Sequence, residues 1–233
     1  MTVADIKKLK DFISKRVKGA SADGVVIGLS GGLDSTVVAT LCVKALGKEN
    51  VLGLVMPSST TNPQDTKDGE RLARTLGIEY KIIPINPVVS AFTHTLRIEK
   101  QPLGNLMART RMCFLYYHAN QRNMLVVGTG NKTEIAIGYF TKWGDAACDL
   151  LPIGDLYKTE VRALAKKLKV PEELIEKPPT AGLWYGQTDE GEIGMSYAKL
   201  DKELQSKGKN KRVRELVSAS EHKRGLPPIC KLT

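Results

Sequence analysis

Short apolar runs that alternate with longer segments of helical periodicity constrain the fold of this chain more than any other feature. The apolar runs cover residues 24–29, 51–56, 80–83 and 124–127. Strands and helices in such alternation form βαβ units, so we expect a mostly parallel sheet. Continuous apolar strands also fit a sheet that is covered by helices on both faces.

The helices expected between these strands have recognisable ends and apolar stripes. Asn62 is a suitable N-cap, Pro63 fits a first turn, and Gly77 can end the helix that they begin. Four further helices are predicted from side chains at helical spacing. Their stripes are Ile6, Leu9, Ile13 and Val17; Val37, Val38, Leu41, Cys42 and Ala45; Ala108, Met112, Leu115, Tyr116 and Ala119; and Val161, Leu164, Ala165 and Leu168.

Length and charge limit the classes to which the protein can belong. The chain has 233 residues, 42% of them hydrophobic and 26% charged, which is typical of a globular protein with one sizeable core. Its net charge of +10 favours nucleotides, nucleic acid or an acidic membrane surface as partners, or is simply a basic solvated surface. No apolar run approaches the roughly 18 residues of a membrane span, and the N-terminus does not read as a signal peptide.

The cysteines favour a reducing compartment. They stand at positions 42, 113, 148 and 230, with no pair at metal-binding or redox spacing. Without a signal peptide, this usage predicts reduced thiols in the cytoplasm. Cys42 and Cys113 fall in helical patterns, so we expect both in the core.

The first apolar run leads directly into a glycine-rich loop, Ser30-Gly31-Gly32-Leu33-Asp34-Ser35, and then into a helix. Glycines let the backbone approach an anion closely, and the amides that begin the helix point toward it. A Walker loop would have lysine at the position of Asp34, whereas this carboxylate can bind Mg²⁺ that bridges phosphates. Since ligands bind beyond the carboxyl ends of parallel strands, the loop predicts a phosphate site there.

The fourth apolar run ends in a second polar loop, residues 128–134. This loop fails as a dinucleotide fingerprint because Thr133 stands where the third glycine is needed. Glu134 can supply a second carboxylate for Mg²⁺ opposite Asp34, and Thr129 can donate to a nucleotide. Taken alone, Glu134 would equally fit an acidic residue favoured at a helix start.

Two stretches are expected to be irregular, residues 93–104 and 176–194. The second is rich in glycine, proline and polar residues and predicts a functional loop or lid, with a mobile surface loop as the alternative. Residues 207–214 are rich in lysine and arginine. They predict a solvated helix start or, alternatively, a binding patch.

The sequence Ser-Gly-Gly-x-Asp-Ser at positions 30–35 resembles the pyrophosphate loop of the N-type ATP pyrophosphatases. Further motifs at residues 105–109, 138–145, 148–153, 156–159, 177–181 and 222–223 are similar to the ammonia-dependent NAD synthetase family, over about residues 5–225. This resemblance implies a doubly wound, mostly parallel five-stranded sheet of the adenine nucleotide alpha hydrolase-like (Rossmann-like) type. It also implies a single domain over residues 1–233 without a glutaminase or amidase domain.

The resemblance implies roles residue by residue. It implies ATP contacts at Gly28, Leu29, Ser30, Gly31, Gly32, Leu33, Asp34, Ser35, Thr129, Lys158 and Thr180, with Asp34 and Glu134 as Mg²⁺ ligands. Contacts with the dinucleotide substrate are implied at Arg109, Lys142, Asp149, His222 and Lys223. Catalytic roles fall to Asp34, Glu134, Asp145 and Lys158. Cations suit a substrate with a pyrophosphate and a carboxylate, although each one alone would more often be a surface charge.

The activity so implied is the amidation of nicotinic acid adenine dinucleotide (deamido-NAD) to NAD by ammonia. The carboxylate would attack ATP to give an acyl-adenylate, with AMP and pyrophosphate as the other products. Lys158 would stabilise the departing pyrophosphate, and Asp145 would bind and deprotonate ammonium. The family implies a homodimer with the substrate at its interface. We expect no nucleic acid and no membrane as partner. Because only one helix precedes the sheet motifs, we expect free ammonia as the nitrogen source, unless a separate subunit supplies it.

Two other functions remain as alternatives on the sequence alone. One is another pyrophosphate-loop adenylating enzyme, such as a tRNA-modifying enzyme, which the net charge favours. The other is a non-catalytic module that binds adenine nucleotides, which would not need both Asp34 and Glu134.

Overall fold

The computed structural model describes residues 2–95, 97–206 and 210–232, and its centre is a parallel β-sheet. The strand order is β3-β2-β1-β4, and every neighbouring pair is parallel. The strands are β1 (Gly24–Gly28), β2 (Val51–Val55), β3 (Glu79–Ile82) and β4 (Met124–Val127). All four apolar runs are therefore strands, as predicted, with ends that differ by at most one residue.

The expectation of five strands is wrong for the described residues, which form four. Beside β4, Leu150 makes only a single parallel bridge with Val127. The Asp149 N–H donates to the Val126 carbonyl at 2.8 Å, and the Gly128 N–H donates to the Leu150 carbonyl at 3.0 Å. Pairing stops there because Pro152, two residues on, has no N–H with which to continue a ladder.

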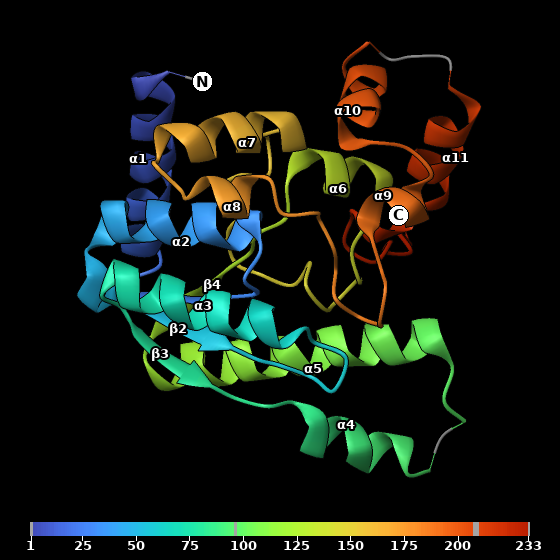
Figure 1. Ribbon diagram of the computed structural model, residues 1–233, viewed down its shortest axis with the longest axis horizontal. Helices are drawn as coiled ribbons and strands as arrows, with labels where there is room; N and C mark the ends of the chain where they lie inside the picture. The colour runs from blue at the N-terminus through green and yellow to red at the C-terminus, as the bar shows by residue number, and fades with distance from the viewer. Residues whose placement is uncertain (1, 96, 207–209, 233) are drawn as a thin grey trace.

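The helices surround this sheet (Figure 1). They are α1 (Val3–Gly19), α2 (Leu33–Leu46), α3 (Pro63–Leu76), α4 (Asn86–Thr93), α5 (Lys100–Gln121), α6 (Lys132–Ile137), α7 (Lys158–Lys167), α8 (Glu172–Ile175), α9 (Asp189–Ile193), α10 (Tyr197–Gln205) and α11 (Lys211–Ala219), with 3-10 turns at Lys48–Asn50 and Glu221–Lys223. The predicted helix ends at Asn62 and Gly77 are confirmed: the Asn62 side chain accepts from the Gln64 N–H, and Gly77 is left-handed. No helix in these residues is both long and apolar enough to cross a membrane.

Both expected loops are shorter than the sequence indicated. Helix α5 begins at Lys100, inside the stretch 93–104, and it tolerates Pro102 because the first helical turn needs no partner for its N–H groups. Helix α9 lies inside 176–194, where three acidic side chains in its first turn suit the helix dipole. The expected helix after residue 207 is α11, and residues 207–209 lie outside the described residues.

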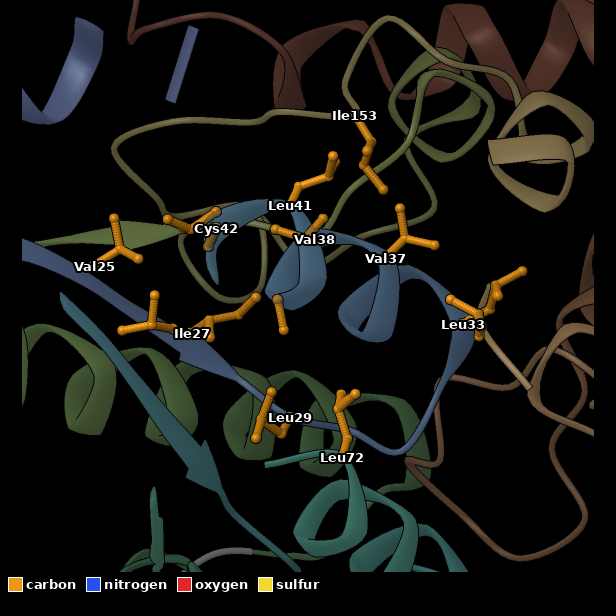
Figure 2. Close-up of a cluster of buried hydrophobic side chains, with 14 of the residues drawn as sticks. Val25, Ile27, Leu29, Leu33, Val37, Val38, Leu41, Cys42, Leu72 and Ile153 are labelled. Atoms are coloured by element: carbon orange, nitrogen blue, oxygen red, sulfur yellow. The ribbon is translucent and has the colours of Figure 1, made fainter. Parts of the chain in front are cut away.

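Alternate side chains of β1 enter two different cores. Val25 and Ile27 join a cluster with α1, α2 and α7 (Figure 2), whereas Val26 joins a cluster with α4 and α5 on the opposite face. Helices thus cover both faces of the sheet, as predicted. Cys42 is buried as expected, but Cys113 is exposed, because it points away from the buried face of α5.

A third cluster joins the C-terminal helices to α6. Ile137 of α6 packs with residues of α9, α10 and α11, which lie close together in Figure 1. The fully buried members include Tyr197 and Leu200 of α10. Each buried large side chain of this kind stabilises the fold by about 1.5–3 kcal/mol. The cluster therefore holds α6 against α9, α10 and α11.

Candidate active site

A cavity of about 440 Å³ lies at the carboxyl ends of β1, β2 and β4. Loops after these strands, part of α5 and the segment 177–187 form its walls. Most of the predicted site residues line it: Gly28, Leu29, Ser30, Gly32, Leu33, Asp34, Ser35, Thr129, Glu134, Asp145, Lys158, Thr180 and Lys223. Within the described chain, the lining does not include Gly31, Arg109, Lys142, Asp149 or His222.

The glycine-rich loop after β1 has the conformation that an anion site requires. Gly31 has φ +74°, and a Cβ there would lie 2.3 Å from the Asp65 carbonyl oxygen, so glycine is needed. The Ser30 and Ser35 hydroxyl oxygens are 3.0 Å apart. Helix α2 has no side-chain cap at Gly32, so its first amides are free for an external acceptor.

Lys158 lines the cavity and lies between the two predicted carboxylates. Its ammonium pairs with Asp34 and is 3.5 Å from Glu134. The Lys158 side chain is 5% exposed, and each carboxylate is 17% exposed. Burial alone would lower the pKa of Lys158, but the charges of Asp34 and Glu134 raise it, so the lysine stays protonated. Burial raises the pKa of Glu134, Lys158 opposes this effect, and Asp34 adds to it.

Local structure and one distant carboxylate hold these groups in place. Glu134 forms a capping box with Asn131, in which each side chain accepts from the other residue's N–H. The Lys158 N–H donates to the Thr133 hydroxyl at 2.9 Å. Asp201 of α10 accepts from that hydroxyl and from the Thr159 N–H, and so ties α6 to α7. Sequence reasoning gave Asp201 no role.

The carboxylates fit a magnesium ion. Mg²⁺ in phosphate-binding sites takes one or two carboxylate oxygens and completes its shell with phosphate and water oxygens. Asp34 and Glu134 both face the cavity beside the phosphate loop. The described residues hold no cluster of three or more potential metal ligands, so a dedicated protein cage for a metal is not formed there. The donor set therefore suits a metal that arrives with phosphates.

Asp145 faces the cavity from the loop after α6. The Thr141 N–H donates to its carboxylate at 2.8 Å. Enclosure by the protein raises the pKa of Asp145, although that hydrogen bond and the charge of Lys223 oppose the shift. Arg111 of α5 also lines the cavity, donates to the Met56 carbonyl at 3.0 Å, and has its pKa lowered to about 10 by burial. Sequence reasoning missed Arg111.

Three of the predicted substrate contacts lie together beside the cavity rather than in its lining. Lys142 donates to the His222 carbonyl at 2.5 Å, and Arg109 donates to the Lys142 carbonyl at 3.2 Å. Lys223 does line the cavity, and it donates to the Gly138 and Phe140 carbonyls. The structure thus brings cations from α5, the loop after α6 and the C-terminal 3-10 turn to one place.

Asp149 has different partners from that group. Its carboxylate accepts from the Val126 N–H at 2.7 Å and from the Tyr116 hydroxyl at 3.3 Å. These contacts anchor the chain to β4. The side chain therefore has a structural use in the described fold, whatever it binds in addition.

The segment 177–188 folds back over the cavity toward α5. The Thr180 hydroxyl donates to the Gln187 carbonyl at 2.8 Å, and the Gln187 side chain accepts from the Leu183 N–H. Leu183 and Trp184 pack against Gly104 of α5. Lys177, Gln187 and Asp189 also line the cavity, and the sequence motifs assigned them no role. A signal existed for Lys177 alone, since it begins a motif that the resemblance used.

A parallel sheet whose strand ends share a glycine-rich loop and a buried lysine–carboxylate group defines a nucleotide-binding α/β enzyme. Comparison with known proteins narrows this class. The family model for NAD synthase matches residues 5–227, and the chain belongs to the NAD synthase family. It is therefore a ligase that forms a carbon–nitrogen bond, and the family predicted from the motifs is confirmed.

Individual relatives agree with this assignment. An NH3-dependent NAD+ synthetase of Methanocaldococcus jannaschii is 50% identical, over 96% of this chain and 95% of its own length. The NMN synthetase structure from Francisella tularensis is similar with a TM-score of 0.93 and 38% identity, over 98% of each chain. The NH3-dependent NAD synthetase from Campylobacter jejuni, in complex with the nitrate ion, has a TM-score of 0.81 and 39% identity, over 98% of each chain.

Proposed function

We propose that this chain amidates deamido-NAD to NAD with ammonia, at the expense of ATP, and releases AMP and pyrophosphate. The observation that carries the proposal is Lys158 between Asp34 and Glu134 beside the phosphate loop. This arrangement suits a reaction in which pyrophosphate leaves with a divalent cation. The relatives named for NH3-dependent NAD+ synthesis support ammonia as the nitrogen source. They give no support to a tRNA-modifying enzyme or a non-catalytic module.

ATP would bind with its phosphates at the loop of residues 28–35. The free amides at the start of α2 and the hydroxyls of Ser30 and Ser35 suit phosphate oxygens. Thr129 and Thr180 would add contacts from the wall of the cavity. Asp34 and Glu134 would hold Mg²⁺, which neutralises charge on the pyrophosphate when it is bound.

The first chemical step would form an acyl-adenylate. An oxygen of the nicotinate carboxylate bonds to the α phosphorus of ATP, and the bond from that phosphorus to the bridging oxygen breaks. Lys158 stabilises the charge that the departing pyrophosphate gains, and its raised pKa keeps it able to do so. The segment 177–188, packed against α5 through Leu183 and Trp184, would keep water from the adenylate.

The second step would transfer nitrogen. Ammonium loses a proton to Asp145, and ammonia bonds to the adenylate carbonyl carbon. The added nitrogen then loses a second proton to water, the bond from that carbon to the AMP oxygen breaks, and AMP leaves as the amide forms. Asp145 faces the cavity, and its raised pKa makes it a stronger base than a free aspartate. Arg111, on the same cavity wall, would offset the charge of the carboxylate.

We propose a homodimer that completes the dinucleotide site. The assigned contacts Arg109, Lys142, Asp149 and His222 lie outside the cavity of one chain. Large apolar side chains are exposed on and next to α4 and α5: Val88, Phe92, Ile98 and Tyr117. Exposed apolar surface of this kind marks contact sites, so a second copy is the partner that we infer.

A second candidate differs only in the substrate. The solved structure with a TM-score of 0.93 is named an NMN synthetase, which suggests the acid form of that mononucleotide as the molecule amidated.

Compartment, domain and fold class complete the proposal. The four cysteines are free, which fits a reducing cytoplasm. We propose a single domain over residues 1–233. We also propose a doubly wound sheet of the adenine nucleotide alpha hydrolase-like type, because β1 lies between β2 and β4 and their following loops meet at the cavity.

The test is an end-point assay of the purified chain with ATP, Mg²⁺, either deamido-NAD or nicotinic acid mononucleotide, and either ammonium or glutamine. We expect NAD and AMP from the dinucleotide with ammonium only. Amide product from the mononucleotide alone would favour the second candidate. AMP and pyrophosphate without an amide product would reject both substrates, and absence of AMP would reject the adenylation.

A further inference from the structure

Lys177 bonds to the phosphate loop from a distant part of the chain. Its Nζ atom lies 3.0 Å from the Gly31 carbonyl oxygen. The same ammonium is 2.7 Å from an oxygen of Asp65 and 2.6 Å from an oxygen of Asp68. One charge thus connects the start of the segment 177–188 with helix α3 and with the loop that follows β1.

Two mostly buried carboxylates surround this ammonium. The Asp65 and Asp68 side chains are 13% and 6% exposed. Asp68 also accepts from Gln64 and Arg71, which fix its orientation. Burial would lower the pKa of Lys177, but its hydrogen bonds to Asp65 and Asp68 raise it, so the charge is retained. Charge-assisted hydrogen bonds of this type are about twice as strong as neutral ones.

The contact with Gly31 fixes more than one atom. A trans peptide is planar, so the Gly31 carbonyl and the Gly32 N–H point in opposite directions. While Lys177 holds the carbonyl, the Gly32 N–H donates to the Ser30 hydroxyl oxygen at 3.2 Å. That oxygen is 3.0 Å from the Ser35 hydroxyl. The direction of both serine hydroxyls therefore depends on the peptide that Lys177 holds.

Helix α3 restrains the same peptide from another side. The space that a Cβ of Gly31 would need is filled by the Asp65 carbonyl, and the residue has a positive φ. A glycine in this conformation is free to rotate unless neighbours hold it. Lys177 supplies the hydrogen bond that selects one orientation.

We propose that Lys177 is a positioning residue for the phosphates of ATP, which acts by holding the Gly31 carbonyl so that the Gly32 peptide and the Ser30 and Ser35 hydroxyls stay aligned. The inference rests on the proposed function, because the phosphates are those of the ATP consumed there. It adds a residue outside the glycine-rich motif to the phosphate site.

Calorimetric titration with ATP, without the second substrate, tests this role. We expect Lys177→Met to weaken ATP binding about tenfold, because one charge-assisted hydrogen bond is lost from the loop. Lys177→Arg, which keeps the charge, should stay within about threefold of the wild type. The control is Lys166→Met, which removes an exposed ammonium 3.1 Å from Glu172, and ATP binding should not change.

Steady-state kinetics supply the readout that separates positioning from stability. The KM for ATP should rise in Lys177→Met while the KM for the nicotinate substrate changes less than about twofold. If Lys177→Met does not fold, Asp68→Asn replaces it, and we expect about threefold weaker ATP binding. Unchanged ATP affinity in the folded variant, or an equal rise in both KM values, would overturn the inference. A wild-type chain that binds no ATP would instead refute the proposed function.

Discussion

The cations at the candidate active site are held in two different ways, either by carboxylates or by main-chain carbonyls. Lys158 is buried and lies between the carboxylates of Asp34 and Glu134. Arg109 and Lys142, beside the cavity, donate to main-chain carbonyls of the loop after α6 and of His222. A buried charge must be compensated within the fold, whereas a charge near solvent does not need a carboxylate partner.

In the proposed mechanism, this difference separates a residue that acts in the chemistry from residues that recognise the substrate. The charge of Lys158 is fixed before any ligand binds, as stabilisation of a leaving group requires. Among the described residues, Arg109 and Lys142 have no carboxylate partner, and we propose that they bind an anionic substrate. Lys158 should therefore control kcat, whereas Arg109 and Lys142 should control the KM of the nicotinate substrate.

The largest effect is expected at the buried group. Replacement of Lys158 by methionine should lower kcat about 10³-fold, because the charge that faces the departing pyrophosphate is lost. The matched control is Lys132→Met, since that ammonium pairs with Asp155 2.7 Å away and both side chains are more exposed. Turnover by coupled AMP detection measures both variants. A kcat within tenfold of the wild type in Lys158→Met would contradict the proposal that the Lys158 charge stabilises the departing pyrophosphate.

A smaller loss is expected at the proposed base. Asp145→Asn should lower ammonia-dependent turnover about 10²-fold at saturating ammonium, with the KM for ATP unchanged. The pKa of Asp145 is raised above the ordinary 3.8, so the acidic limb of the wild-type rate profile should lie above that value and turnover should fall as pH drops through it. Asp155→Asn, at an exposed carboxylate, is the control. Full turnover in Asp145→Asn would exclude the role.

At Arg109, the change should appear in the binding of the nicotinate substrate. Arg109→Ala should raise the KM of the nicotinate substrate about tenfold, because one charge-assisted contact is lost. The KM for ATP and kcat should stay near the wild-type values. Arg74→Ala, which removes an exposed arginine paired with Glu70, serves as the control. A drop in kcat without a change in KM would show that Arg109 acts in the chemical step, as Lys158 is expected to.

The smallest effect is expected at an ion pair remote from the cavity. Glu79 of β3 accepts two hydrogen bonds from Arg122, and these lower the pKa of Glu79. Since the folded pKa is below the unfolded one, the pair stabilises the fold above pH 4.5, and this stabilisation is lost as pH falls through the lowered pKa. Glu79→Gln should cost about 0.5 kcal/mol by urea denaturation at neutral pH, with kcat unchanged. A loss of several kcal/mol would show that exposed pairs here behave like buried ones.

Local features explain which parts of the molecule the sequence could predict. The four strands follow from apolar runs, and the phosphate loop follows from glycines next to Asp34, because both depend on neighbours in sequence. The prediction of a fifth strand was wrong because Pro152 ends the pairing of Leu150 with β4 after a single bridge. The predicted loop 93–104 was longer than the observed one because Pro102 fits the first turn of α5.

Contacts between distant residues explain the rest. Lys158 meets Asp34 across 124 positions, and Lys177 meets Gly31 across 146. No periodicity or spacing indicates such pairs, so Lys158 came from the family resemblance and the contacts of Lys177 needed the fold. Asp201 was missed for the same reason, since its donors Thr133 and Thr159 lie on two other elements.

In the proposed mechanism, the cavity joins AMP to the nicotinate carboxylate before nitrogen is added. Deamido-NAD labelled with ¹⁸O in both carboxylate oxygens tests it directly by mass spectrometry of the products. We expect AMP to carry one ¹⁸O and the NAD amide to keep the other. AMP without label, or ADP in place of AMP, would contradict this mechanism.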